Sequence, residues 1–444
     1  MATSTDGTPV TILTGSLGAG KTTLLNRLLA GAADRDVAVL VNDIGELNVD
    51  ADLVDEASEP SVADGTVTEL SNGCICCELR DDLETAVVRL ARERSFDHLV
   101  VEPSGISDPG PVARLFTGGS PAAARYRVDA VVAVVDSRLF ADTFDPDGDP
   151  TEAVASDGDG ETRPLSELLV EQVEFADVVL LNKTDLVTDD ELAHVEEVVR
   201  TLRPDARIHP TTYSEIDVDE VLGLGVFEPG AAAERAGWKR ALESDERDGD
   251  EHDGAAHDHG SDGHDHAHEG HGHGDDHDHD HDHVHPEEDF GITSFTYRRR
   301  RPFHPERIAA VLADLPPSVI RSKGHLWVAG REDAHLTFSQ AGPSAAVEVT
   351  GRWIASLPEF EQRSYRNNRS DLGFEWDDEW GDRRTELVFI GQDVDGDSLR
   401  ARLDEALLTD AEFESGPDAW ASLSGLGQFP SEPGAEAVLA TPTD

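Results

Sequence analysis

Long apolar runs and dispersed cysteines are both missing from this 444-residue sequence. No stretch reaches the roughly 18 consecutive apolar residues that a membrane-spanning helix requires, and Met1 to Pro9 has neither the basic nor the apolar region of a signal peptide. The three cysteines all lie between positions 74 and 77, where they cannot staple distant segments as a disulfide scaffold does. We therefore expect a cytoplasmic protein without membrane contacts, whose clustered thiols serve metal or redox chemistry.

Positive charge is scarce as well. The chain has 36 basic against 92 acidic residues, a net charge of −56, and its only lysines are Lys21, Lys183, Lys239 and Lys323. Such a surface repels nucleic acid and anionic membranes, so neither is expected as a partner. Because the acidic residues recur along the whole chain, we interpret them as a halophilic surface whose self-repulsion is screened by high salt. A surface adapted to one basic partner is the alternative.

The first 225 residues alternate short apolar runs with helical patterns. Several runs are continuous and β-branched, which is typical of strands covered on both faces. Strands alternating with helices predict right-handed crossovers and a mainly parallel α/β sheet over residues 1–225. The predicted strands are Val10–Thr14, Val37–Asn42, Val67–Leu70, His98–Glu102, Ala130–Asp136 and Val178–Asn182, and the predicted helices cover 21–30, 79–93, 164–176 and 189–202.

Residues 226–289 interrupt this pattern with an acidic, His-rich linker that cannot bury a core. Periodicity resumes at Ile292 and predicts a smaller α+β domain over residues 290–410, followed by a turn-rich tail, 411–444, that we expect to pack loosely. In this domain the predicted strands are Ile292–Tyr297, Val319–Val328, Ala334–Ser339, Ala346–Trp353 and Glu386–Ile390, with helices near 304–314 and 396–407.

A phosphate-binding loop is predicted where the first strand meets the first helix. Residues 15–22 read Gly-Ser-Leu-Gly-Ala-Gly-Lys-Thr, and this pattern predicts a P-loop NTPase domain. Its glycines let backbone N–H groups surround the phosphates, while Lys21 contacts the β- and γ-phosphates and the Thr22 hydroxyl binds Mg²⁺. A glycine-rich turn that matches by chance is the alternative. The predicted contacts from this loop are Gly15, Ser16, Gly18, Ala19, Gly20, Lys21, Thr22 and Thr23.

A second acidic group is expected near the Mg²⁺ ion, at the end of a neighbouring strand. The segment His98-Leu-Val-Val-Glu102-Pro-Ser-Gly105 provides it. We assign catalytic roles to Glu102 together with Lys21 and Thr22, and we expect the backbone N–H of Gly105 to approach the γ-phosphate. A solvated carboxylate at the strand end is the alternative for Glu102.

The base is predicted to be guanine. Asn182-Lys-Thr-Asp185 follows an apolar strand, and a carboxylate at Asp185 can accept two hydrogen bonds from N1–H and the exocyclic amine of guanine. Adenine lacks this donor pair and leaves the acceptor unpaired. Lys183 can lie over the purine ring, while Asn182 supports the site or, alternatively, only caps a turn. The sequence therefore predicts GTP in preference to ATP.

A metal site is predicted on the segment Asn72-Gly-Cys-Ile-Cys-Cys77. Thiolates suit Zn²⁺ and Cu(I), and Cys74, Cys76 and Cys77 are close enough in sequence to converge on one ion. The tight spacing favours an incomplete, exchangeable site over a closed structural one. Apolar packing of some cysteines, or a redox dithiol, are the alternatives, although the C-x-x-C spacing of thioredoxin-like sites is missing.

Two further segments are candidate metal contacts. The loop Asn42-Asp-Ile-Gly-Glu46 occupies the position of a GTPase switch, and Glu46 is our candidate ligand there; a solvated polar loop is the simpler alternative. Residues 252–285 hold 13 of the 19 histidines, interspersed with Asp and Gly. Neutral imidazoles bind Zn²⁺, Ni²⁺ and Co²⁺, so this tract is either a metal buffer or only a linker of biased composition.

Together these motifs resemble the CobW-type family of metallochaperone GTPases, which is related to the nitrile hydratase activators. The resemblance lies in the phosphate loop, the C-x-C-C segment, Glu102-Pro-Ser-Gly105 and the guanine segment, and it extends to 321–331 and 381–391 of the C-terminal domain. One departure is Asp43, because the family usually has Glu at this position of the switch.

The resemblance implies slow GTP hydrolysis with Mg²⁺, a Zn²⁺ or Co²⁺ site at the three cysteines, and delivery of the ion to a client metalloprotein. We expect nucleotide and metal to bias the same loops, so that each changes the affinity for the other. A cobalt-handling GTPase of cobalamin synthesis, a nickel-insertion GTPase, and a metal-storage protein that relies on its His tract are the alternatives. The sequence leaves the client and any homo-oligomer open.

Overall fold

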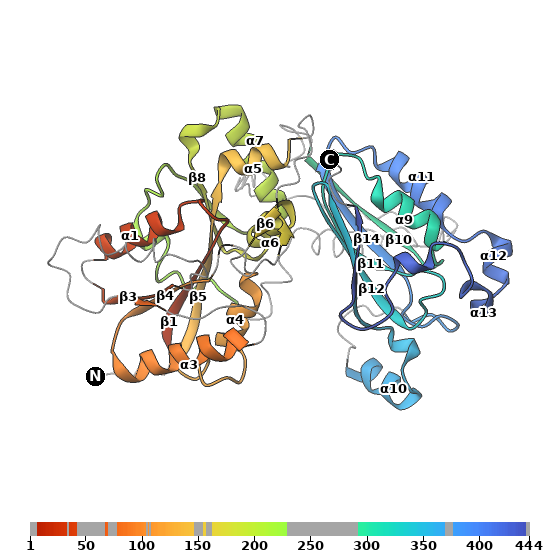
Figure 1. Cartoon of the computed structure of the whole chain (residues 1–444), viewed down its shortest axis with the longest axis horizontal. Helices are drawn as coiled ribbons and strands as arrows, with labels where there is room; N and C mark the ends of the chain where they lie inside the picture. The colour runs from red at the N-terminus through yellow and green to blue at the C-terminus, as the bar shows by residue number, and fades with distance from the viewer. Residues whose placement is uncertain are drawn as a thin grey trace, which may run out of the picture.

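The computed structural model describes residues 7–32, 35–41, 67–69, 78–103, 105, 108–145, 154–156, 162–228, 292–368 and 376–440. It contains an N-terminal domain around a parallel sheet and a C-terminal domain around an antiparallel sheet, which lie side by side (Figure 1). This confirms the predicted fold class. No helix within these ranges has the length and apolar character needed to cross a membrane.

The N-terminal sheet has the strand order β3-β2-β4-β1-β5-β8-β9, and its strands pair in parallel. Its inner strands are buried along nearly their whole length, as expected for apolar strands covered on both faces. The strands are β1 (Thr8–Thr14), β2 (Val37–Val41), β3 (Val67–Glu69), β4 (His98–Glu102), β5 (Tyr126–Asp136), β8 (Val178–Asn182) and β9 (Arg207–Pro210).

Helices cover both faces of this sheet and bury two separate apolar clusters against it. They are α1 (Lys21–Gly31), α3 (Glu78–Glu93), α4 (Pro109–Thr117), α5 (Ser137–Thr143), α6 (Leu165–Phe175) and α7 (Asp189–Leu202), with the 3₁₀ turns η1 (Thr184–Leu186) and η2 (Val218–Glu220). A short hairpin of β6 (Val154–Ser156) and β7 (Thr162–Pro164) precedes α6. The sequence pattern does not predict α4, α5, β9 or this hairpin.

The C-terminal sheet is antiparallel, with the order β10-β14-β11-β12-β13-β15. One face packs on α9 and α11 through a large apolar cluster (Figure 1). The strands are β10 (Ile292–Arg299), β11 (Val319–Leu326), β12 (Ala334–Ala341), β13 (Ser344–Arg352), β14 (Thr385–Gln392) and β15 (Glu436–Ala440). The helices are α9 (Pro305–Ala313), α10 (Glu359–Asn368), α11 (Gly396–Ala406), α12 (Asp410–Glu414) and α13 (Pro417–Trp420), with the 3₁₀ turns η4 (Ile354–Ser356) and η5 (Leu426–Gln428).

The segment after residue 410 packs more tightly than the sequence suggested. Trp420 and Phe429 are fully buried, and Glu436–Ala440 forms the edge strand β15 by pairing with β13. Trp420 belongs to a cluster of aromatic rings with Trp327 and Trp380. The expectation of a loosely packed tail was therefore wrong, because large aromatic side chains anchor the turns between the short helices.

The two domains share one apolar cluster. It combines Leu169, Val170 and Val173 of α6 with Ile320 of β11 and Val388 of β14. In Figure 1, α6 and the β6–β7 hairpin lie on the side of the N-terminal domain that faces the C-terminal sheet. Helix α6 is thus part of both the N-terminal domain and the domain interface.

Candidate functional site

The loop between β1 and α1 has a backbone that only glycine accommodates at two points. Gly15 has φ +148° and Gly20 has φ +114°. A Cβ atom on Gly15 would lie 2.4 Å from the carbonyl oxygen of Val134, and one on Gly20 would lie 2.3 Å from Nδ2 of Asn182. Backbone close to its neighbours, in conformations that L side chains avoid, is what a loop wrapping a phosphate requires.

Lys21, the first residue of α1, folds back over this loop. Its ammonium group donates to the carbonyl oxygens of Gly15 at 2.9 Å and Ser16 at 3.1 Å, and it lies 3.9 Å from Oε1 of Glu102 at the end of β4. Both side chains are nearly fully buried. The structure thus brings together Lys21 and Glu102, which are 81 positions apart in the sequence.

The residues around this loop fit a bound phosphate. The hydroxyl groups of Thr14 and Ser16 are buried and have no hydrogen-bond partner in the described part of the chain. Buried polar groups are normally paired, so these two point to a polar ligand. Leu17 and Gly18 at the loop tip and Thr23 are exposed, whereas Ala19 is buried and Thr22 half-buried. A phosphate can therefore approach from the open side of the loop.

Gly105 lies against the phosphate loop. A Cβ atom built on it would lie 3.1 Å from Nζ of Lys21 and 3.2 Å from the backbone nitrogen of Leu17. Its carbonyl oxygen accepts a hydrogen bond of 3.1 Å from Nε2 of Gln172 on α6. Gly105 is predicted from the sequence but Gln172 is not, because a glutamine within an amphipathic helix carries no local signal of its role.

Asn182, at the end of β8, ties the phosphate loop to the segment that follows β9. Its Nδ2 donates to the carbonyl of Ala19 at 2.7 Å, and its Oδ1 accepts from the Thr211 hydroxyl at 3.2 Å and from the Ser214 backbone at 2.8 Å. The Ser214 hydroxyl in turn donates to the carbonyl of Gly20 at 3.1 Å. Asn182 is therefore a buried support of the phosphate loop, and more than a turn cap.

The segment from Thr211 to Ser214 was not predicted as part of the site. Tyr213 and Ser214 both have positive φ, 53° and 55°, and the backbone carbonyl of Tyr213 accepts a hydrogen bond from Arg27 of α1. Tyr213 is 70% exposed. Two consecutive residues in the left-handed backbone conformation beside Asn182 mark this segment as part of the site. This feature can be seen in the structure but not in the sequence.

Lys183 and Asp185 lie on the exposed side of this segment. Lys183 has φ +61°, and its ammonium donates to Oδ2 of Asp136 at 2.6 Å. Asp136 and Asn182 end the neighbouring strands β5 and β8 in register. Asp185, in η1, is exposed. An exposed carboxylate next to a lysine side chain that is held in place can accept hydrogen bonds from the edge of a base.

The predicted metal ligands Cys74, Cys76, Cys77 and Glu46 lie outside the described residues, as do Asp43 and the His tract. Within the described ranges, no group of three or more His, Cys, Asp or Glu side chains could hold a metal ion. The cysteine site therefore stays a prediction from the sequence. The residues on both sides of it are placed: β3 ends at Glu69, and α3 begins at Glu78.

The family comparisons agree with the two-domain architecture. The model of the CobW/HypB/UreG nucleotide-binding domain matches residues 9–210, and that of the cobalamin synthesis protein CobW C-terminal domain matches residues 292–407. These two matches fall on the parallel and antiparallel sheets respectively.

Individual relatives extend this likeness. The zinc-regulated GTPase metalloprotein activator 1 of Dictyostelium discoideum is 34% identical over 431 residues, covering 93% of this chain and 82% of the relative. The zinc chaperone CobW of a Sinorhizobium species is 36% identical over 224 residues, covering 49% of this chain and 63% of the relative. The Zn(II)-bound YjiA GTPase of Escherichia coli, a solved structure, is 20% identical with a TM-score of 0.37, covering 91% of this chain and all of that one. On the family matches and the first of these relatives, the chain belongs to the CobW/HypB/UreG family of P-loop GTPases.

Proposed function

We propose that this protein is a GTP-hydrolysing metallochaperone that binds Zn²⁺ and delivers it to a client metalloprotein in the cytoplasm. The observation that carries the GTPase half is the phosphate loop closed by Lys21, Glu102 and Gly105. The zinc half is supported by relatives named as a zinc chaperone and as a zinc-regulated activator, and by three thiolates in four residues of the sequence.

The site residues have distinct tasks in this proposal. Lys21 places a buried positive charge beside the β- and γ-phosphates, where it stabilises charge that develops during hydrolysis. Thr22 and Glu102 are the residues that would hold Mg²⁺, which when bound neutralises the phosphate oxygens. The backbone N–H of Gly105 donates to the γ-phosphate, and Asp185 accepts from guanine. The contacts of Gly15, Ser16, Gly18, Ala19, Gly20, Thr23, Asn182 and Lys183 complete the nucleotide site.

We propose that the nucleotide state controls the cargo through the sheet from which the cysteine segment and the phosphate loop both extend. The segment with the three cysteines connects β3 to α3, and β3 is two strands from β4, which ends at Glu102. We propose that Cys74, Cys76 and Cys77, with Glu46 from the loop after β2, hold Zn²⁺ while GTP is bound and release it after hydrolysis. Linkage then requires zinc to change the affinity for GTP by the same factor.

The test compares zinc affinity and GTP turnover in the full chain and in a Cys74→Ser, Cys76→Ser, Cys77→Ser variant. The proposal expects the parent to bind zinc more tightly with GTPγS than with GDP, and its GTP turnover to respond to zinc. The variant should lose both effects. A variant whose turnover responds to zinc as the parent does would show that the thiolates are not the zinc site.

A His-tract deletion and a Lys21→Ala variant separate the alternatives. Deleting residues 252–285 should leave the tight zinc site intact if the cysteines hold it. Lys21→Ala should abolish client activation with intact zinc binding in a chaperone, and should have no effect in a storage protein. Metal analysis of protein purified without an affinity tag distinguishes zinc from cobalt and nickel.

A further inference from the structure

Helix α6 is fastened to the C-terminal domain near both of its ends. In its last turn, Glu174 accepts two hydrogen bonds from Arg321 of β11, at 2.9 and 3.0 Å, and the arginine side chain is fully buried. In its first turn, the Ser166 hydroxyl donates to the carbonyl of Ala341 at the end of β12, at 2.7 Å. These two contacts are eight positions apart, or about 12 Å along the helix axis.

The Glu174–Arg321 ion pair favours a single geometry. Arg321 also donates to the Ser339 hydroxyl at 2.9 Å and to the Gln340 carbonyl at 3.2 Å, so its guanidinium is bound on both sides. A two-pronged arginine–carboxylate contact fixes orientation as well as distance. Because both charges are buried, sliding the helix along the sheet would leave them unpaired, at a high free-energy cost.

The opposite side of α6 reaches the nucleotide site. Gln172 is 2% exposed and donates to the carbonyl of Gly105. Residues 172 and 174 are two positions apart on an α-helix and therefore point roughly 200° apart around its axis. One turn of α6 thus contacts Gly105 on one side and Arg321 on the other.

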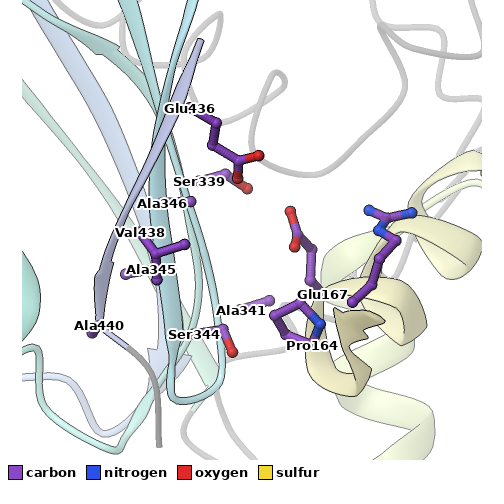
Figure 2. A pocket seen from close by; sticks show the side chains of 11 residues that line it. Pro164, Glu167, Ser339, Ala341, Ser344, Ala345, Ala346, Glu436, Val438 and Ala440 are labelled. Atoms are coloured by element: carbon purple, nitrogen blue, oxygen red, sulfur yellow. The ribbon is translucent and has the colours of Figure 1, made fainter. Parts of the chain in front are cut away.

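The seam between the domains is hollow near the first turn of α6. A cavity of about 220 Å³ is lined there by Arg163 and Glu167 of the N-terminal domain and by β12, β13 and β15 of the C-terminal sheet. Figure 2 shows Glu167 and Glu436 of β15 pointing into this cavity. The seam is therefore packed around Glu174 and hollow beside Glu167, while the Ser166 hydroxyl still ties the first turn of α6 to Ala341.

Several ionisable side chains of α6 and β11 lie close enough to affect one another's pKa. Burial, with the neighbouring Glu171, raises the pKa of Glu167. Burial, with the neighbouring Arg321, lowers the pKa of Lys323, while Glu174, Glu171 and Glu167 act in the opposite direction. A displacement of α6 would change the surroundings of all these groups at once.

We propose that Gln172 is a positioning residue for the γ-phosphate contact of Gly105, and that α6 carries the nucleotide state to the C-terminal sheet through Glu174 and Arg321. A γ-phosphate that accepts a hydrogen bond from the Gly105 N–H fixes this residue in place. The carbonyl of the same residue accepts a hydrogen bond from Gln172, so the position of Gln172 is fixed as well. The helix then holds one position at the seam, and loss of the phosphate releases it. This inference rests on the proposed GTPase cycle, and it names the mechanical link between that cycle and the second domain.

The first test compares GTPγS and GDP affinities of Gln172→Leu with those of the parent. Loss of the hydrogen bond to Gly105 should weaken GTPγS binding roughly 3- to 10-fold and change GDP binding less than twofold. Gln362→Leu is the matched control, because Gln362 also donates to backbone carbonyls, those of Ala355 and Leu357, but lies in the C-terminal domain. If the ratio of GTPγS affinity to GDP affinity is the same in the parent and in Gln172→Leu, the positioning role is wrong.

The second test follows the C-terminal domain. Amide hydrogen exchange of 319–326 in the full chain should be slower with GTPγS than with GDP, and this difference should vanish in Gln172→Leu. Arg321→Met should lower the GTPγS to GDP affinity ratio at least threefold. Ser166→Ala, which removes an interdomain hydrogen bond without leaving a buried charge, should lower it in the same direction and covers the case in which Arg321→Met fails to fold.

These outcomes separate the inference from the proposed function. If the zinc affinity of the parent is the same with GTPγS and GDP, the proposed chaperone cycle is wrong, regardless of the hydrogen-exchange result at the domain interface. If zinc affinity in the parent differs between GTPγS and GDP but amide hydrogen exchange of 319–326 is the same with both nucleotides, the chaperone cycle stands and the relay through α6 is wrong.

Discussion

The side-chain nitrogen of Asn182 lies 2.7 Å from the carbonyl oxygen of Ala19, so the end of β8 holds the phosphate loop directly. Asn182→Ala removes this contact together with those to Thr211 and Ser214. Leaving such buried groups unpaired costs about 1–3 kcal/mol each. We expect affinity for GTP and GDP to fall about tenfold or more, measured by calorimetry, with a lower Tm. Asn182→Asp keeps the shape but not the donor; GTP affinity at the parental level in this variant would contradict the structural role.

Gly20 tests the backbone of the same loop. Gly20→Ala forces an L residue to φ +114° with its Cβ against Asn182. We expect a destabilisation of about 1–3 kcal/mol and loss of most GTP binding, measured by thermal unfolding and nucleotide titration. Gly119→Ala is the control, because nothing lies within 4 Å of a Cβ atom there. A Gly20→Ala protein that binds GTP as the parent does would refute the need for glycine at this position.

Asp185 decides the choice of base in our proposal. Asp185→Ala should lower GTP affinity by about 2 kcal/mol or more and leave the weaker ATP affinity nearly unchanged, so that the preference collapses. Asp190→Ala, at another exposed acidic position nearby in α7, should change neither. Competition binding of GTP and ATP to all three proteins measures this. A preserved ratio in Asp185→Ala would move base selection to another residue.

His98 predicts a loss of stability in mild acid. It is buried on β4, its Nε2 is hydrogen-bonded to the Thr11 hydroxyl, and burial lowers its pKa to about 4, against the opposing effect of Asp129. The unfolded chain therefore takes up this proton near pH 6.5 and the folded protein only near pH 4. The free energy of unfolding is therefore unaffected by the protonation of His98 well above pH 6.5. Below that pH the unfolded chain is stabilised by the proton, so the free energy of unfolding falls by about 2 kcal/mol between pH 7 and pH 5.

The measurement is the free energy of unfolding of the parent and of His98→Gln at pH 7 and pH 5. Glutamine can keep a hydrogen bond to Thr11 but does not titrate. We expect His98→Gln to be less stable than the parent at pH 7 and to lose about 2 kcal/mol less on acidification. Identical losses in both proteins would show that His98 is not the group responsible.

The acidic surface predicts a dependence on salt. With a net charge of −56, self-repulsion should weaken the folded state in dilute buffer and be screened in molar KCl. A gain of about 2 kcal/mol would raise the Tm by roughly 4–8 °C. Equal melting temperatures in the two buffers would argue for a surface adapted to a basic partner. Sorbitol at matched osmolality controls for effects that do not depend on charge.

The phosphate loop could be predicted from the sequence because its chemistry is local. Glycines at 15 and 20 are required by one short stretch of backbone, and the strand before it and the helix after it are visible as apolar periodicity. The alternation of strands and helices likewise predicted the parallel sheet, since few other arrangements bury such strands on both faces.

Tertiary structure alone decided which distant residues meet. Gln172 reaches Gly105, Glu174 reaches Arg321, and Ser214 reaches Gly20 only because parallel crossovers and domain packing bring separate segments to one sheet edge and one seam. Strand β15 was missed for the same reason: Glu436–Ala440 is an exposed to half-buried edge strand, whereas β4 and β8 are buried along their whole length, and its pairing with β13 is what makes it a strand. Local backbone demands leave a signature in the sequence, whereas contacts between segments depend on how the whole chain packs.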